Sequence, residues 1–347
     1  MQSPVQSSAP AESFSKVLRS ILNSGAVRIA VLLWILGYII ALWLARGSLP
    51  FDRPAIAQLS FATQMAAPTV GLLEIFLLMI MTFFLTRKRL IPDMQARAPE
   101  RAAAGRETAL MLGYAALGQI GGWILGPALG YRPFSFHIAG TLVGCAIEPS
   151  RAEVWVWALY NFLVFALLPY LFFRRRYSNR DLNLRSSDRR NDAVLILIVL
   201  VVESGFELAF FNKNMFSLSG HQILVGGPLT FFIFLIGTVL PTMVLIYCIL
   251  LPRYLKLTGS AITTTLLGGL TYAAMHLVEG WSLFDTPRHA ALSVIFVMLN
   301  YFGPGMIKSV LTLRTGNAWV HAISYHSVAP HLIVDSPLMV KVFAIAP

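Results

Sequence analysis

Long apolar runs recur along the whole chain and are separated by short polar segments. A helix crosses the hydrocarbon core of a bilayer with about 20 predominantly apolar residues, and about nine runs approach that length. The predicted spans are 26–45, 66–86, 109–129, 153–173, 193–211, 227–250, 263–281, 290–311 and 317–335. We therefore predict an all-α, polytopic transmembrane helical bundle, with tails at 1–25 and 336–347.

The composition narrows the class of protein. The chain is 56% hydrophobic and only 12% charged, whereas a soluble domain carries about 25% charged residues. This excludes a soluble globular enzyme, a disordered chain and a nucleic-acid reader. The partner that the composition predicts is the lipid bilayer, with no nucleic acid.

The positive charges indicate an orientation. The formal net charge is +11, and most basic residues fall in alternate loops, with runs at 87–89 and 174–176. Lys308 and Arg314 are assigned to the same side of the membrane as these basic loops. Cytoplasmic loops are enriched in Lys and Arg, so we predict a cytoplasmic N-terminus, an outside C-terminus and basic cytoplasmic loops within 26–189. The polar start and the compact loops favour a bacterial inner membrane.

Ionisable residues inside the predicted spans are candidates for function, because they are costly in hydrocarbon. Glu203 and Glu207 are four residues apart and share one helix face. At about 1.5 Å per residue, both lie near the middle of the bilayer, as do His276 and His326. These four residues are the predicted catalytic groups of one buried polar site.

Three kinds of chemistry suit such a site. A carboxylate can act as a general base on water, and two histidines can stabilise an oxyanion. The same groups can bind a divalent metal such as zinc, with His276, His326 and Glu207 as candidate ligands. A proton-coupled transporter uses the same residue types.

Other polar positions receive structural interpretations from the sequence. Glu74 is interpreted as a structural or lipid-facing residue, and His137 as a loop residue without a partner. Glu279 is expected to cap the outer end of the seventh span. The segment 130–152 is apolar but broken by proline, which predicts a re-entrant or interfacial piece on the outer side.

Two motifs resemble those of the CPBP family, the CAAX prenyl proteases and bacteriocin-processing membrane proteins. The stretch FGPGMIKSVLTLRTGNAWVHAISYH (302–326) is similar to the C-terminal signature of the family, including its Thr-Gly-Asn, a following Trp and a His nine residues after the Asn. LTYAAMH (270–276) is similar to its FxxxH motif, with Tyr272 in place of Phe. The resemblance covers about 190–335 and implies a CPBP-like peptidase core there.

The resemblance implies roles for particular residues. Glu207, or Glu203 in its place, activates water, and His276 and His326 orient the water or stabilise the oxyanion. The supporting residues are His331, Glu279, Tyr272 and Asn317. The sequence departs from the family motifs EExxxR and HxxxN, because Phe206, Phe211 and Pro330 replace a Glu, an Arg and an Asn.

Three functions follow, in order of preference. The first is an intramembrane endopeptidase that cleaves a membrane-embedded or lipidated hydrophobic peptide. The second is a catalytically inactive CPBP-fold protein of the binding or immunity type, favoured by the replaced motif residues. The third is a proton-linked transporter, which ranks last because the internal repeats common in transporters are not evident.

Overall fold

The computed structural model describes residues 13–51, 59–137, 148–211, 213–279 and 281–347, and their regular elements are helices. Six helical stretches are long and apolar enough to cross a membrane: α2 (Gly25–Ala45), α4 (Phe61–Thr86), α5 (Arg101–Ala128), Arg151–Arg174, Gly220–Thr258 and α13 (Pro287–Thr315). The all-α class and the association with a membrane are therefore confirmed.

Two of these stretches contain local π-helical turns. Arg151–Arg174 consists of α6 (Arg151–Asn161), η2 (Phe162–Leu167) and α7 (Leu168–Arg174). Gly220–Thr258 consists of α9 (Gly220–Phe234), η5 (Leu235–Val239), α10 (Leu240–Thr242), η6 (Met243–Leu250) and α11 (Leu251–Thr258).

The predicted spans 193–211, 263–281 and 317–335 are not among the six. They fall in α8 (Arg189–Phe206) with the π-turn η3 (Glu207–Phe211), in the 15-residue α12 (Ala261–Met275), and in α14 (Ala318–His321) with the π-helix η7 (Ala322–Ile333). The remaining elements are α1 (Phe14–Asn23), η1 (Gln95–Arg97), η4 (Lys213–Ser217) and α15 (Val334–Val342).

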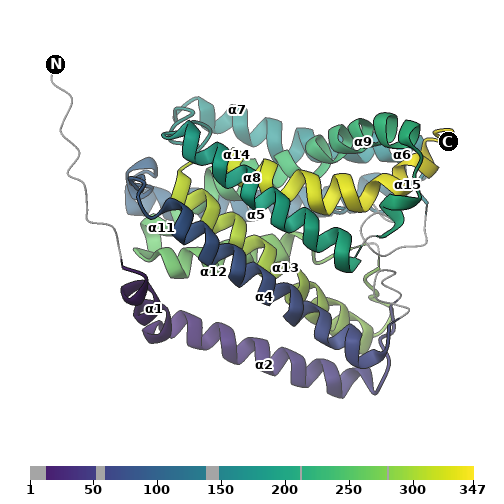
Figure 1. Cartoon of the computed structure of the whole chain (residues 1–347), viewed down its shortest axis with the longest axis horizontal. Coiled ribbons are helices and arrows are strands. Elements are labelled where there is room, and N and C mark those ends of the chain that lie inside the picture. Colours follow the sequence, from purple (N-terminus) through teal and green to yellow (C-terminus); the bar gives the residue numbers. More distant parts are fainter. Residues whose placement is uncertain (1–12, 52–58, 138–147, 212, 280) are drawn as a thin grey trace.

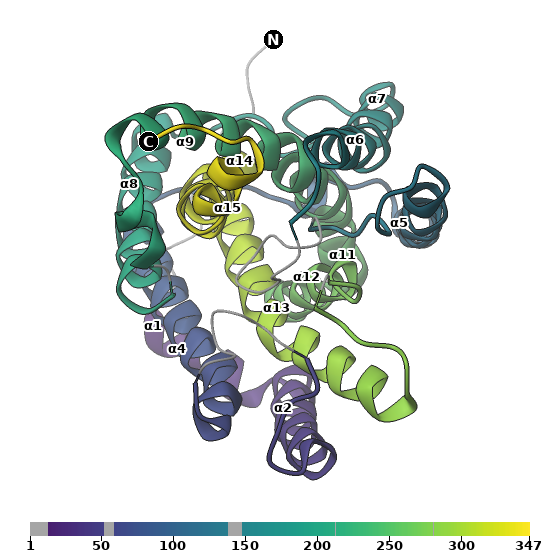
Figure 2. The same cartoon turned by 90° about the vertical axis from the view of Figure 1, so that its right-hand side faces the viewer.

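The long helices lie side by side, and their connections gather at the two ends of the bundle (Figure 1). Seen along the bundle, α12, α13 and the C-terminal α14–α15 lie inside an arc formed by α2, α4, α8, α9, α6 and α5 (Figure 2). The central α13 packs against α12 and α4, and η7 packs against α8 and α9. The helices of the arc thus surround α12, α13 and η7.

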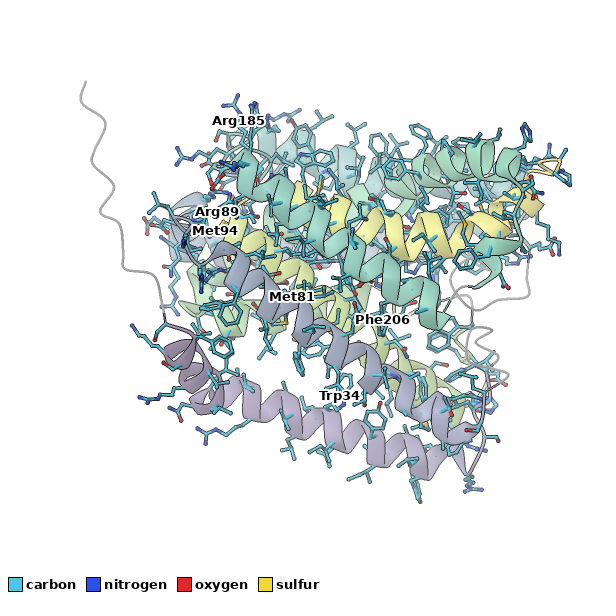
Figure 3. The ribbon with its side chains drawn as sticks, viewed as in Figure 1. Trp34, Met81, Arg89, Met94, Arg185 and Phe206 are labelled. Atoms are coloured by element: carbon cyan, nitrogen blue, oxygen red, sulfur yellow. The ribbon has the colours of Figure 1, made fainter. Side chains whose placement is uncertain are left out.

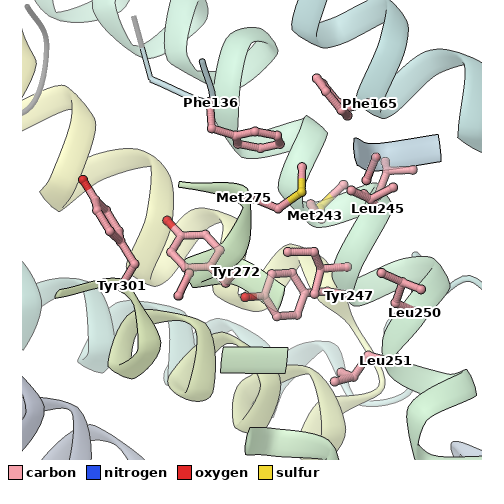
Figure 4. Close-up of a cluster of buried hydrophobic side chains, with 14 of the residues drawn as sticks. Phe136, Phe165, Met243, Leu245, Tyr247, Leu250, Leu251, Tyr272, Met275 and Tyr301 are labelled. Atoms are coloured by element: carbon pink, nitrogen blue, oxygen red, sulfur yellow. The ribbon is translucent and has the colours of Figure 1, made fainter. Parts of the chain in front are cut away.

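The interior and the outer surface are both apolar. All eight residues of η6 are buried, and they join a cluster that includes Tyr272, Met275 and Tyr301 (Figure 4). On the outside, large apolar side chains such as Leu33, Trp43 and Leu117 are 62%, 71% and 69% exposed. Because water disfavours so much exposed apolar surface, this surface faces lipid.

Helix ends follow ordinary capping chemistry. The Ser150 and Ser219 side chains accept from the backbone N–H groups of Glu153 and Gln222 in reciprocal capping boxes at the starts of α6 and α9. The long helix α13 ends at Gly316, whose φ of 63° lies in the left-handed region that glycine tolerates best.

Candidate functional site: a polar cavity between apolar helices

A cavity of about 150 Å³ lies between α4, α8, α12, α13 and η7. Its apolar walls are interrupted by a set of polar side chains: Glu74, His137, Glu203, Glu207, Tyr272, Asn300, Tyr301, Lys308, Tyr325 and His331. Four of the predicted site residues line this cavity: Glu203, Glu207, Tyr272 and His331. A fifth, His326, contacts Tyr272.

Carboxyl groups form one wall of the cavity. Glu203 of α8 is 2% exposed and lies within hydrogen-bonding reach of Glu74 of α4. Glu207 is one turn further along and interacts electrostatically with Glu203. Two touching carboxylates repel each other when both are charged, so the two side chains are electrostatically linked. Glu74, interpreted from the sequence as a structural or lipid-facing residue, lines both this cavity and a neighbouring groove.

Lys308 faces the carboxyl wall from α13. It is 1% exposed, and its Nζ lies 3.6 Å from the ring centroid of Tyr272 and 5.6 Å from that of Tyr325. It also interacts electrostatically with Glu203. The sequence assigned Lys308 to the basic cytoplasmic residues, and the structure corrects this. A lysine inside an apolar run is a visible signal of a buried site.

His276 and His326 lie behind Tyr272 and do not line the cavity. The Tyr272 Oη is 3.3 Å from His326 Nε2, and His326 Nδ1 is 3.3 Å from Thr242 Oγ1. On the other side, His276 Nδ1 donates to the Tyr272 carbonyl oxygen over 2.6 Å. Both predicted catalytic histidines therefore position Tyr272, which is the side chain that reaches the cavity.

The continuous helical segment α14–η7 brings three histidines onto one side. His321, His326 and His331 are spaced by five residues, and in an α-helix of about 3.6 residues per turn such residues point in different directions. Here His321 ends α14, and His326 and His331 lie in the following η7, a π-helix whose backbone bonds join residues five apart. Their ring centroids are 6.5 Å (His321–His326) and 5.2 Å (His326–His331) apart.

A second group of titratable side chains adjoins the cavity. His137, His276 and Glu279 are all buried, and one ligand atom from each lies within 4.8 Å of the others. Glu279 Oε1 accepts from His137 Nδ1 over 2.9 Å, so the expectations that His137 lacks a partner and that Glu279 caps a helix are both corrected. Of the predicted metal ligands, His276 belongs to this group, and His326 and Glu207 do not.

Asn317, a predicted supporting residue, lies away from the cavity, where it caps the N-terminus of α14. Its side chain accepts from Trp319 N–H, and its Nδ2 donates to Asp192 over 2.9 Å. Asp192 also forms a buried ion pair with Arg89. Arg89 is labelled near Met94 at the left-hand end of the bundle in Figure 3. The Thr-Gly-Asn signature is thus part of a structural junction in this chain.

A second buried basic residue completes this junction. Arg97 donates to Asn183 Oδ1 over 2.6 Å and to the Gly316 carbonyl oxygen over 2.7 Å. Burial, followed by the nearby charge of Arg180, lowers the pKa of Arg97 to about 10. From the sequence, Arg89 and Arg97 are interpreted only as topology signals, because their hydrogen-bond partners are distant in the chain.

The cavity continues toward the outer surface of the bundle between α4 and α8. A groove there is lined by Val70, Leu73 and Leu77 of α4 and by Val202, Gly205 and Phe206 of α8, and it shares Glu74 and Phe206 with the cavity. Because Leu73 and Leu77 are 62% and 52% exposed, the groove opens sideways on the lipid-facing surface.

Together, the apolar helices and the enclosed ionisable groups define a helical membrane protein with a polar intramembrane cavity. No family model matches the chain, and neither a curated protein nor a solved structure matches it. The resemblance to the CPBP family therefore stays a prediction from the two motifs.

Proposed function

We propose that the chain is an intramembrane hydrolase of the CPBP peptidase type that cleaves membrane-embedded or lipidated peptides. One observation carries this proposal. Glu203 and Glu207 share a cavity between apolar helices with Lys308 and Tyr272. A carboxylate that faces an amine and a phenol can supply the base and the oxyanion donors for hydrolysis of a carbonyl compound.

The chemistry divides between the two walls of the cavity. Glu203 takes a proton from a water molecule while the water oxygen attacks the peptide carbonyl carbon. Lys308 and the Tyr272 hydroxyl then donate to the oxyanion, and His326 positions that hydroxyl. As the carbon–nitrogen bond breaks, the Glu203 carboxyl returns the proton to the leaving nitrogen.

The sideways groove supports a substrate that arrives through the lipid. Its walls are apolar apart from Glu74, so an aliphatic side chain or a lipid chain enters it without losing hydration. The groove shares Phe206 with the cavity. Phe206 replaces the first motif Glu of the family, and it gives the entrance an apolar surface.

The chain crosses an inner membrane about nine times, with the N-terminus inside and the C-terminus outside. The six apolar stretches, together with α8–η3, α12 and α14–α15, provide the passes between the two ends of the bundle. The basic connections support the orientation, because Arg89 and Arg97 join Asp192 and Asn183 at one end. That end faces the cytoplasm.

Cleavage of a pooled library of transmembrane and lipidated peptides by the purified protein, read by mass spectrometry, tests the function. We expect wild type to cut a subset, and Glu203→Gln and Lys308→Met to lose at least about 100-fold in rate. Glu148→Gln is the matched control, because this carboxyl side chain is 43% exposed and lies outside the cavity.

Two outcomes would contradict the proposal. Unchanged cleavage in monodisperse Glu203→Gln would remove Glu203 as the base. Specific peptide binding without cleavage by wild type would identify a binding protein that uses the same cavity, in agreement with the replacements at Phe206 and Pro330.

A further inference from the structure

His137 reaches the interior on a non-helical segment that the surrounding helices hold in place. The Ser135 carbonyl oxygen accepts from Trp157 Nε1 over 2.9 Å and from Asn161 Nδ2 over 3.1 Å. The next carbonyl oxygen, of Phe136, accepts from Thr238 Oγ1 over 3.0 Å. Irregular backbone inside a membrane protein is stable only when its polar groups are satisfied in this way. Three side chains therefore deliver His137, 1% exposed, to a fixed place.

Glu279 is fixed by a turn that follows α12. Its N–H donates to Ser282 Oγ over 3.3 Å, and its carbonyl oxygen accepts from Ser282 N–H over 2.9 Å. Ser293 of α13 clamps the same turn, because its Oγ accepts from Leu283 N–H over 2.9 Å. The Glu279 carboxyl, 3% exposed, is thereby held against His137.

The hydrogen bonds define which ring nitrogens are available. His276 Nδ1 lies 2.6 Å from a carbonyl oxygen, and His137 Nδ1 lies 2.9 Å from a carboxylate oxygen. The carbonyl oxygen requires an N–H, so His276 keeps a lone pair on Nε2. His137 Nδ1 and Glu279 Oε1 face each other, and a cation that replaces the proton between them is bound by both. Each Nε2 is buried and has no hydrogen-bond partner within the described part of the chain. The two ring centroids are 4.6 Å apart.

We propose that His137, His276 and Glu279 bind a divalent transition-metal ion of the zinc class. Two imidazoles and one carboxylate form a ligand set that zinc accepts, with the fourth coordination position left open. A histidine that ligates a metal through one nitrogen donates its other N–H to a carbonyl or carboxylate, and His276 already does so through Nδ1. His137 contributes Nδ1, the ring nitrogen that lies beside Glu279 Oε1. The site adjoins the cavity through His137.

His331 is a further imidazole of the same kind beside the site. Its Nδ1 lies 3.0 Å from Asp335 Oδ2, its Nε2 has no partner among the residues described, and its ring centroid is 5.4 Å from that of His137. The metal site does not depend on the hydrolase function, because its geometry involves neither Glu203 nor Lys308.

Metal content of the full-length protein in detergent tests the site without any substrate. The protein is stripped with a chelator, reloaded with Zn²⁺ and measured by mass spectrometry of the metal. We expect about one equivalent per chain and an affinity about 100-fold lower in His137→Gln and Glu279→Gln. His326→Gln and Glu207→Gln, which alter the ligands expected from the sequence, retain the zinc.

Cobalt provides a spectroscopic check that separates ligand loss from misfolding. In His137→Cys, a thiolate bound to Co²⁺ adds a sulfur-to-metal charge-transfer band that wild type lacks, and we expect this band. The site is refuted if reloaded wild type holds no zinc above the buffer, or if His137→Gln and Glu279→Gln bind like wild type. It is also refuted if monodisperse His137→Cys lacks the charge-transfer band.

Discussion

Replacing Arg89 with methionine tests whether buried polar contacts stabilise the end of the bundle that we assign to the cytoplasm. The Arg89 side chain is 2% exposed and is paired with Asp192, whose side chain is 5% exposed. It also donates to the Thr315 carbonyl oxygen over 2.8 Å and to Asn191 Oδ1 over 3.1 Å. One guanidinium thus connects the loop after α4, the start of α8 and the end of α13.

The magnitude follows from the charge that remains. Methionine keeps most of the apolar stem, so packing changes little. Asp192 stays buried, however, and the neutral Asn317 amide at 2.9 Å does not replace the lost positive charge. Removing one member of a buried ion pair costs about 3–5 kcal/mol in the free energy of unfolding. The double variant Arg89→Met with Asp192→Asn removes the charge as well, and we expect a coupling of about 0.5–3 kcal/mol in its favour.

Unfolding in mixed detergent micelles, with increasing denaturing detergent and helix content as the signal, measures these differences. Arg87→Met is the matched control, because Arg87 belongs to the same basic run and is exposed. Its free energy of unfolding is expected within about 0.5 kcal/mol of wild type. If Arg89→Met unfolds at the same detergent fraction as Arg87→Met, Arg89 contributes to topology alone and the junction does not stabilise the fold.

Three further predictions concern the backbone, the groove and the orientation. Gly316→Ala is expected to destabilise the protein by about 1–3 kcal/mol in the same titration, because φ is +63° and a Cβ would lie 2.7 Å from a guanidinium nitrogen; wild-type stability would contradict this. Gly205→Trp is expected to block the groove and slow peptide cleavage, whereas Gly113→Trp, outside the groove, is expected to cleave at the wild-type rate. Neither variant is expected to lose stability, because an added Cβ meets nothing within 4 Å at either position. Equal cleavage by both would exclude substrate entry through the groove. In a cysteine-free background, an impermeant maleimide applied to intact spheroplasts is expected to label Phe216→Cys and not Leu90→Cys, whose native side chains are 72% and 60% exposed; the reverse pattern would invert the orientation.

The helical class could be read from the sequence because the lipid solvent acts on one segment at a time. Each run of apolar residues has to satisfy its own backbone, so its length and composition predict a helix without knowledge of its neighbours. The same reasoning located Glu203, Glu207, His276 and His326 as polar residues within the bundle. It could not assign their contacts, which depend on how separate helices pack.

The cavity contacts illustrate this limit. Glu74, Glu203 and Lys308 come from α4, α8 and α13, and no spacing rule connects residues so far apart in the chain. His137 is harder still, because it lies on a non-helical segment whose place is set by Trp157 and Asn161. The π-helical backbone of η7 is a third case, since the α-helical period separates histidines that the structure aligns.

The two ends of the polar interior differ in how their groups are satisfied. At the junction, Arg89 and Arg97 are matched to acceptors by several hydrogen bonds. Around the cavity and the metal site, buried atoms of Glu203, His137 and His276 have no partner among the described residues. An unsatisfied buried polar atom costs about 1–3 kcal/mol, so these atoms weaken the fold unless a ligand meets them. The hydrogen bonds of the junction are expected to stabilise the fold, and the unpaired atoms of Glu203, His137 and His276 agree with the substrate and metal sites that we propose there.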